Sequence, residues 1–403
     1  MRGILDGLRV VEGSAFIAAP LGGMVLAQLG ADVIRFDQIE GGLDRGRWPL
    51  APSGESLFWT GLNKGKRSIR LDLKSAEGQE IVARLATRPG PDAGIFLTNL
   101  PARAALAYEA LKARRADMIM MLLTGNPDGS SEVDYTVNAA MGFPSVTGPR
   151  GGEGPVNSVL PAWDIAMGEM AAVGILAALR HRTRTGEGSL VKLALSDVAL
   201  AATSALGRLA QGQLGAEVKA DGNHLYGAFG IDFATRDGRR VMVVGLTGRQ
   251  WKALCEVTGL DVGALAAQTG ADLGKEGGRY QARDAIAAAL APWFAARELA
   301  EVKRVLDAGG VSWGPYQSFR QLAAEDARAS TKNPIFSMVD QPGVGSILAA
   351  GSPLDFAGVA RLPARPAPRL GQHTDEILSE VGFSTAEIGG LYDRGVVRGP
   401  DAG

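Results

Sequence analysis

Short apolar runs and helical patterns alternate along the first part of the chain. Residues 8–12 form an apolar run that predicts a buried strand, and Gly13 ends it. A helical pattern covers residues 18–30, and residues 31–36 form a second apolar run. Strand, helix and strand in this order predict one βαβ unit, in which the two strands lie parallel. The glycines here do not follow the G-x-G-x-x-G spacing of a dinucleotide site.

The same alternation continues to residue 124. A helical pattern covers residues 75–87, and two further apolar runs, 93–98 and 118–123, end at Asn99 and Thr124. Repeated units of this kind predict an α/β fold with a doubly wound sheet. Ligands of such sheets bind at the carboxyl ends of the strands. We therefore expect Asn99 and Thr124 to lie near a ligand.

The pattern changes after residues 1–210. Residues 211–222 carry no periodic pattern and predict a linker. Residues 223–330 combine a predicted hairpin with several helical patterns, which indicates a compact α+β domain. The last segment, residues 331–403, is extended and proline-rich at first and carries a helical pattern further on.

Composition narrows the classes of function. The formal net charge is −1 over 403 residues, so no global basic field attracts nucleic acid or a membrane surface. The one cysteine, Cys255, excludes an internal disulfide framework and favours a reducing, cytoplasmic location. The three histidines are scattered along the chain, so no metal site is expected. Neither an export signal nor a membrane span is expected.

Asp164 is the main candidate for chemistry. It follows a Gly- and Pro-rich segment, 151–161, and precedes a long apolar helical pattern, 166–184. An aspartate at a helix start is commonly an N-cap that accepts a backbone hydrogen bond. The alternative is a carboxylate nucleophile, kept ionised by the positive end of the helix dipole and offered to an electrophilic carbonyl. The residues around Asp164 leave both interpretations open.

A dense basic run occupies residues 63–70. Its cations include Lys64, Lys66 and Arg67. A run of this kind is commonly a solvated loop. The alternative is a phosphate clamp, in which the Lys and Arg side chains and the N–H groups of the following helix bind phosphate oxygens. Such a clamp would suit a nucleotide-containing ligand.

A glycine-interrupted aromatic segment follows the predicted linker. Tyr226, Gly227, Phe229 and Gly230 are its characteristic residues. The segment fits a tight turn or, alternatively, a lid that closes over a reacting group. A lid would exclude water from reactive intermediates.

Taken in order, several segments resemble family III CoA-transferases. The resemblance runs the full length of the chain, and the ordered combination is more specific than any one segment. The segments are residues 5–11, 29–35, 63–73, Asp164, 174–188, the pairs 222–223 and 237–238, and 368–377.

The resemblance implies a fold, an assembly and a ligand. The large domain would be Rossmann-like and built from both chain ends, residues 1–210 and 331–403, with residues 223–330 as the smaller α+β domain. Two chains would thread through each other as interlocked rings, giving a homodimer. The substrate would be the CoA thioester of a small dicarboxylic acid. No cofactor beyond CoA, no metal, no nucleic acid and no membrane would be involved.

The resemblance also assigns site residues. Asp164 would be the covalent nucleophile. Two positions differ from formyl-CoA transferases: Ile17 stands where they have glutamine, and Gln38 where they have arginine. These differences bear on the acyl group and on the adenine end of CoA rather than on the nucleophile. The positions that match CoA contacts of the family are Ile17, Ala18, Leu71, Asp72, Leu73, Lys74, Asn99 and, after a shortened segment, Arg103.

Some segments indicate a branch of the family. Residues 11–16, 48–49, 131–138, 160–164 and 226–230 are similar to members that move CoA between the two carboxyl groups of one small dicarboxylic acid. They are less similar to formyl-CoA transferases. The alternative within the family is intermolecular transfer from an acyl-CoA to a separate carboxylate.

Two further classes of function stay open. Acyl-CoA racemases share the aspartate but pair it with a histidine base directly before another Asp, and Val133 stands at that place here. No histidine precedes His181. Racemisation needs two positioned acid–base groups, so it is the weaker interpretation. A non-enzymatic CoA- or nucleotide-binding protein would use Asp164 only as a helix cap.

Overall fold

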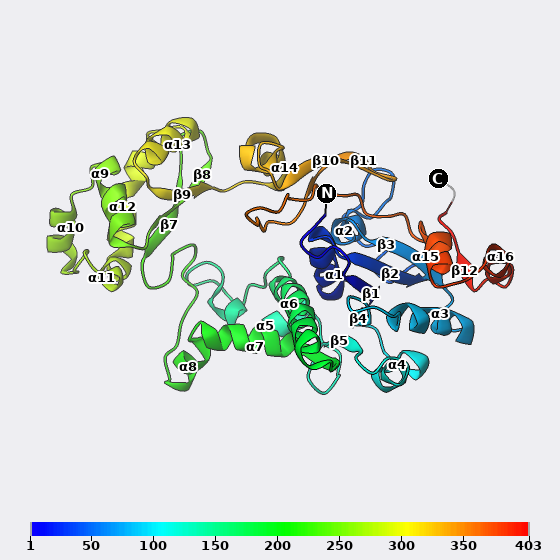
Figure 1. Cartoon of the computed structure of the whole chain (residues 1–403). Coiled ribbons are helices and arrows are strands. Elements are labelled where there is room, and N and C mark those ends of the chain that lie inside the picture. The colour runs from blue at the N-terminus through cyan, green and yellow to red at the C-terminus, as the bar shows by residue number, and fades with distance from the viewer. Residues whose placement is uncertain (1, 402–403) are drawn as a thin grey trace. The chain divides into compact units, whose positions relative to one another are not determined.

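The computed structural model describes residues 2–401 of the chain, which divides into two compact units (Figure 1). The first unit comprises Met1–Met141, Ser158–Ala216 and Ala327–Gly403, and the second comprises Gly142–Asn157 and Glu217–Asp326. Residues 1, 402 and 403, which the predicted domain ranges include, lie outside the described residues.

The first unit is an α/β domain. Its strands are β1 (Arg9–Gly13), β2 (Asp32–Gln38), β3 (Arg67–Leu71), β4 (Ile95–Thr98), β5 (Ile119–Thr124), β6 (Ser189–Ala194), β10 (Phe336–Gln341), β11 (Gly345–Ala350) and β12 (Val397–Arg398). Its helices are α1 (Ala18–Gln28), α2 (Leu57–Leu62), α3 (Ala76–Ala86), α4 (Tyr108–Arg114), α5 (Asp134–Ala140), α6 (Ala162–Thr185), α7 (Leu195–Ala205), α8 (Arg208–Gln213), α15 (Thr374–Glu380) and α16 (Thr385–Asp393).

A seven-stranded sheet organises this unit, with the strand order β12-β3-β2-β1-β4-β5-β6. Strands β1 to β6 are parallel, and β12 pairs antiparallel with β3. From β1 the chain winds through β2 and β3 on one side, then through β4, β5 and β6 on the other. The carboxyl ends of β1 and β4 therefore flank the point where the strand order reverses, which is where open α/β sheets bind their ligands.

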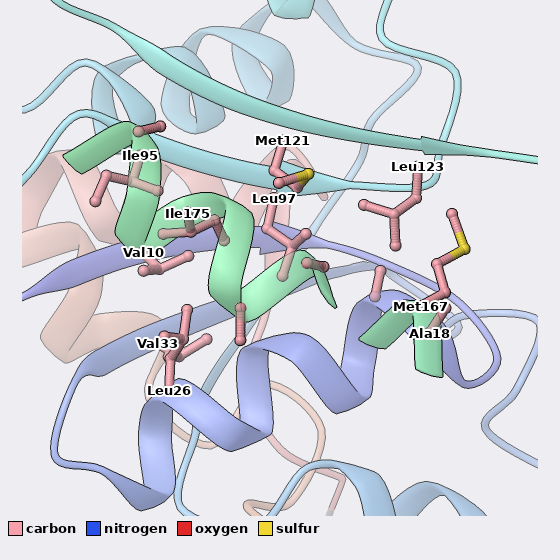
Figure 2. Packing of buried hydrophobic residues seen from close by; sticks show 14 of the residues in the cluster. Val10, Ala18, Leu26, Val33, Ile95, Leu97, Met121, Leu123, Met167 and Ile175 are labelled. Atoms are coloured by element: carbon pink, nitrogen blue, oxygen red, sulfur yellow. The ribbon is translucent and has the colours of Figure 1, made fainter. Parts of the chain in front are cut away.

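Both faces of the sheet are buried, because successive residues of a strand point to opposite sides. Val10 and Val33 pack with α1 and α6 in one cluster, which Figure 2 shows from close by. Val11 and Ile34, the next residues along the same strands, pack with α3, α15 and α16 in a second cluster. The predicted α/β architecture with a parallel-dominated sheet is confirmed.

The second unit combines a small sheet with several helices. Its sheet is antiparallel, with the order β7-β8-β9, and Phe229, Trp251 and Phe294 are among its buried core residues. A turn at Asp237 and Gly238 joins β7 to β8, as the sequence predicts. Its elements are β7 (Phe229–Ala234), β8 (Arg240–Gly245), β9 (Ser312–Pro315), α9 (Gly248–Thr258), α10 (Val262–Thr269), α11 (Glu276–Gln281), α12 (Arg283–Ala295), α13 (Leu299–Ala308) and α14 (Phe319–Glu325).

The structure differs from the predicted boundaries at residues 142–157. The sequence placed them in the first part of the large domain, whereas they belong to the second unit. There Arg150 pairs with Asp221 at 2.6 Å and with Asp284 at 3.0 Å. These partners are distant in sequence, and local patterns do not reveal contacts of that kind.

Helix α6 begins at Ala162, earlier than the predicted start at residue 166. By length and composition it is the one helix among residues 2–401 that could cross a membrane, a test that core helices of soluble proteins also pass. Met167, Ala171 and Ile175 are buried against the sheet. Core packing therefore accounts for the apolar character of that side of α6.

Candidate active site

A cavity of about 790 Å³ lies in the first unit, where the strand order of the sheet reverses. Its walls come from the loop after β1, the segments after β4 and β5, and the starts of α5 and α6. Ala18 and Met167, both labelled in Figure 2, belong to the core cluster and also line the cavity. Six residues that the sequence singled out line it together: Ile17, Ala18, Asn99, Arg103, Thr124 and Asp164.

The side chain of Asn99 makes two hydrogen bonds to the loop that follows β1. Its side-chain oxygen accepts from the Ala15 N–H at 2.9 Å, and its side-chain nitrogen donates to the Ala15 oxygen at 2.8 Å. Phe16, the next residue, has a φ of 65°, a left-handed conformation that is costly for a residue with a Cβ. Its N–H donates to the buried Asp44 carboxylate at 3.1 Å. These bonds hold the strained loop that leads into α1 at the cavity wall.

Asp164 is the third residue of α6 and lines the cavity. The N-cap interpretation is wrong, because Pro161 holds the N-cap position and has no side-chain bond. The N–H groups of Trp163 and Asp164 donate instead to the carboxylate of Asp134, on α5. The Asp164 side chain is therefore not needed to cap its own helix.

Burial raises the pKa of the Asp164 carboxyl group to about 6, and the Asp134 carboxylate adds to this effect, whereas Arg47 opposes it. The sequence predicted that the helix dipole would keep Asp164 ionised. In the structure, burial and a neighbouring negative charge outweigh the helix terminus. Asp164 is thus a carboxylate above about pH 6, and a more basic one than an exposed aspartate. That combination suits a nucleophile.

Arg47 is a cavity residue that the sequence did not reveal. Its guanidinium carbon lies 5.6 Å from the ring centre of Phe16 and 5.1 Å from that of Phe58. Both rings make cation–π contacts that hold the guanidinium at the cavity wall. Arg47 is a single cation in a loop without periodicity, so no sequence pattern marks it. A guanidinium there is suited to bind a carboxylate of the ligand.

The basic run lies elsewhere. The ammonium group of Lys66 is fully buried and donates to Glu12 at 2.8 Å. Arg67 pairs with Asp32 at 2.6 Å and also binds carboxylates on α15. The ammonium group of Lys64 donates to the Gly61 oxygen at 2.6 Å. None of the three lines the cavity, and a phosphate could reach Lys66 only if Glu12 lost its partner. We therefore assign Lys66 and Arg67 to ion pairs that hold the sheet together.

The predicted CoA contacts at residues 71–74 lie at the end of β3, at the same edge of the sheet as Asn99. Leu71 is the last residue of β3, and Asp72, Leu73 and Lys74 follow it. Leu71 is buried in the core and Leu73 packs against it. Lys74 is exposed, as is Arg103 at the cavity wall. Among the cations that the sequence assigned to CoA, Lys74 and Arg103 are therefore available to an anionic ligand, whereas Lys66 and Arg67 are engaged in ion pairs.

The predicted lid belongs to the second unit. Phe229 and Gly230 lie in β7, where Phe229 is buried against Trp251 and Gly230 pairs with Val244. They are strand residues and cannot open without breaking the sheet, which corrects the prediction for these two. Tyr226 and Gly227 lie in the loop before β7, and Tyr226 is 49% exposed.

Comparison with protein-family models matches residues 5–374 to CoA-transferase family III. The chain belongs to this family. It is 59% identical to the 2-methylfumaryl-CoA isomerase of Chloroflexus aurantiacus, over 100% of this chain and 99% of that protein. It is 30% identical to the succinyl-CoA:mesaconate CoA-transferase of Haloarcula hispanica, over 95% and 98% of the two chains. A solved CaiB/BaiF family protein from Brucella suis superposes with a TM-score of 0.77 at 25% identity, over 94% of this chain and 100% of that one.

Family membership confirms the predicted resemblance. It also makes Val133 informative, because acyl-CoA racemases have a histidine at this place. The Val133 side chain is 54% exposed and lines the cavity. An alkyl side chain cannot exchange a proton, so the cavity wall offers no imidazole base beside Asp164. Among residues 2–401, no cluster of three or more His, Cys, Asp or Glu side chains could hold a metal ion.

Proposed function

We propose that the protein is an intramolecular CoA-transferase that converts 2-methylfumaryl-CoA (mesaconyl-C1-CoA) into 3-methylfumaryl-CoA (mesaconyl-C4-CoA). The observation that carries this proposal is the 59% identity, over the whole chain, to a 2-methylfumaryl-CoA isomerase. The cavity supports it with a half-buried carboxylate of raised pKa, Asp164, and with Arg47, a cation that can pair with the free carboxylate of the substrate.

The proposed first half-reaction moves CoA onto the protein. The Asp164 carboxylate attacks the C1 thioester carbonyl, the C–S bond breaks, and an acyl-aspartyl anhydride and a CoA thiolate form. The thiolate then attacks the aspartyl carbonyl of the anhydride. This step leaves an aspartyl-CoA thioester and free mesaconate.

The second half-reaction repeats these steps at the other end of the substrate. The C4 carboxylate of mesaconate attacks the aspartyl-CoA thioester and expels the thiolate. The thiolate then attacks the C4 acyl carbonyl of the new anhydride, which releases 3-methylfumaryl-CoA and restores the Asp164 carboxylate. Each step exchanges one acyl bond for another, so no outside reductant, oxidant or net proton is needed.

Each carbonyl attack creates an oxyanion that needs hydrogen-bond donors. The start of α6 is a poor source, because Asp134 already accepts the N–H groups of Trp163 and Asp164. Ile17, the N-cap residue of α1, and Ala18, its first residue, line the cavity, and the first N–H groups of a helix have no partner within it. We assign the oxyanion donors to this turn.

Retention of mesaconate makes the transfer intramolecular. The free acid keeps its second carboxylate beside aspartyl-CoA, and well-oriented neighbours react as if at about 10⁵ M. Arg47, which makes cation–π contacts with Phe16 and Phe58, is the residue that would keep the carboxylate in place.

Isomerisation is therefore expected without any added acceptor acid. The enzyme is incubated with 2-methylfumaryl-CoA and an excess of isotope-labelled mesaconate or succinate, and the label in the CoA thioesters is followed against the rate of isomerisation. Scarcely any label should enter the product, since bound mesaconate reacts before it exchanges. Label uptake at the rate of isomerisation would show an ordinary intermolecular transferase.

Intermolecular transfer between an acyl-CoA and a free carboxylic acid is the second candidate. The 30% identity to a succinyl-CoA:mesaconate CoA-transferase favours it, and the same Asp164 chemistry serves it. Racemisation is weaker, because Val133 replaces the expected histidine. Deuterium incorporation from heavy water at the α-carbon of a saturated 2-methylacyl-CoA would reveal it.

We further propose a cytoplasmic homodimer of interlocked chains that needs no cofactor beyond the CoA of its substrate. Met170 and Val173 on α6 and Leu200 on α7 are 49%, 59% and 44% exposed. Exposed large apolar side chains on two helices support an interface between chains there. As the resemblance suggests, the reaction would serve the 3-hydroxypropionate cycle of carbon fixation.

A further inference from the structure

Asp134 ties the start of α5 to the start of α6. One of its carboxylate oxygens, Oδ2, accepts two hydrogen bonds, from the Trp163 N–H at 2.8 Å and from the Asp164 N–H at 3.0 Å. Asp134 is only 2% exposed. Because the N-cap residue, Pro161, supplies no side-chain acceptor, a carboxylate from another helix takes over the capping of α6.

A second bond one helical turn further along α5 fixes the same segment. Asn138 is 8% exposed, and its side-chain oxygen accepts from the indole nitrogen of Trp163 at 3.0 Å. Val137, between the two, is buried in the core cluster. The start of α6 is thus held from α5 at two points: Asp134 binds its backbone, and Asn138 binds the side chain of Trp163.

Asp134 also places a negative charge beside the Asp164 carboxyl group. Burial and this charge together raise the pKa of Asp164 to about 6, and Arg47 acts in the opposite direction. The other titratable side chains at the cavity wall are Arg103, Glu132 and Tyr135. A more basic carboxylate is a stronger nucleophile toward a thioester carbonyl.

We propose that Asp134 is a positioning residue for the covalent reaction: it fixes the backbone of Asp164 and, through its charge, sets the reactivity of the Asp164 carboxylate. The inference rests on the proposed function, in which Asp164 attacks the thioester. A carboxylate suits the role because it binds two N–H groups at once and carries the charge. A neutral cap would supply the bonds alone.

Asp134→Asn separates these two contributions, since it keeps an acceptor oxygen and nearly the same shape but removes the charge. The kcat/KM of the wild-type enzyme should fall as pH drops through about 6, because protonated Asp164 cannot attack. In Asp134→Asn this acid limb should move to lower pH. At pH 8, kcat should fall about tenfold, with little change in KM, because the nucleophile is less basic.

Two further variants complete the test. Asn138→Ala removes the tie to Trp163 without changing any charge, so kcat should fall while the acid limb stays in place. Asp197→Asn removes the same charge from the first turn of another helix, α7, where the aspartate is exposed, and should leave both the limb and kcat unchanged. Circular dichroism and thermal unfolding of each variant establish that it is folded.

An acid limb that stays in place in folded Asp134→Asn would overturn the charge contribution. Unchanged kcat in both Asp134→Asn and Asn138→Ala would overturn the positioning role. If Asp134→Asn does not fold, Asn138→Ala alone tests the proposal. A reduced kcat with the acid limb at its wild-type pH would support it, because the tie to Trp163 would then act on position without changing the charge beside Asp164. A shift of the acid limb in Asn138→Ala would contradict it. The proposed function is judged separately, by whether the wild-type enzyme forms the aspartyl-CoA thioester at Asp164.

Discussion

Replacing Asp164 by alanine is expected to reduce the turnover of 2-methylfumaryl-CoA by at least about 10⁴-fold, the scale seen when a covalent nucleophile is removed. The nearby Asp134 carboxylate cannot replace it, because it is bound to the backbone of α6 and is 2% exposed. Asp164→Asn should be nearly as damaging, because an amide is a poor nucleophile. Both are measured as initial rates of isomerisation at saturating thioester.

The fold should survive both substitutions. The Asp164 side chain does not cap α6, and the bonds that hold this turn come from its backbone and from Asp134. The matched control is Asp197→Ala, because Asp197 is also the third residue of a helix but is exposed. It should keep full activity. If folded Asp164→Ala retained a tenth of the wild-type turnover, the covalent mechanism would be wrong.

Replacing Arg47 by alanine is expected to lower kcat/KM for 2-methylfumaryl-CoA by about 10- to 100-fold, the scale of losing a hydrogen bond to a charged group. The guanidinium contacts two aromatic rings at the cavity wall, and its loss leaves the free carboxylate of the substrate without its counter-charge. Arg47→Lys should recover only part of the loss, because an ammonium cannot make the forked contact with a carboxylate or stack on the rings in the same way.

The half-reaction with different thioesters shows whether Arg47 recognises the second carboxylate. Arg47→Ala should slow the formation of the aspartyl-CoA thioester from 2-methylfumaryl-CoA, but hardly from a monocarboxylic thioester of similar size. Arg45→Ala is the matched control, since Arg45 lies in the same loop, pairs with Asp401 and does not line this cavity. Equal losses with both thioesters would contradict a carboxylate-binding role for Arg47.

Much of the fold follows from the sequence, because its causes are local. Alternating apolar runs predict the parallel strands, and the strand ends place Asn99 and Thr124 at the cavity. The Gly- and Pro-rich segment before α6 predicts that Asp164 lies at the start of a helix. These features depend on residues close together in the chain, and hydrophobic periodicity records such relations.

The errors share a different cause, which is pairing between distant residues. The basic run looks the same in sequence whether it faces solvent, a phosphate or buried carboxylates, and the partner of Lys66 is Glu12, on another strand. The cap of α6 comes from Asp134, on another helix. Phe229 has the composition of a lid residue but is buried in the core of the second unit. Arg47 has no local signal, since its environment is made by Phe16 and Phe58.

The central claim is that Asp164 carries CoA covalently during turnover, and mass spectrometry tests it most directly. The enzyme is mixed with 2-methylfumaryl-CoA, quenched in acid within the first turnovers and digested, and the peptide that contains Asp164 is analysed. The account predicts that this peptide gains the mass of CoA less one water, that hydroxylamine replaces the CoA by a hydroxamate at the same residue, and that Asp164→Asn never acquires the CoA mass. Rapid isomerisation without any adduct at Asp164, or with the adduct on another residue, would contradict the account.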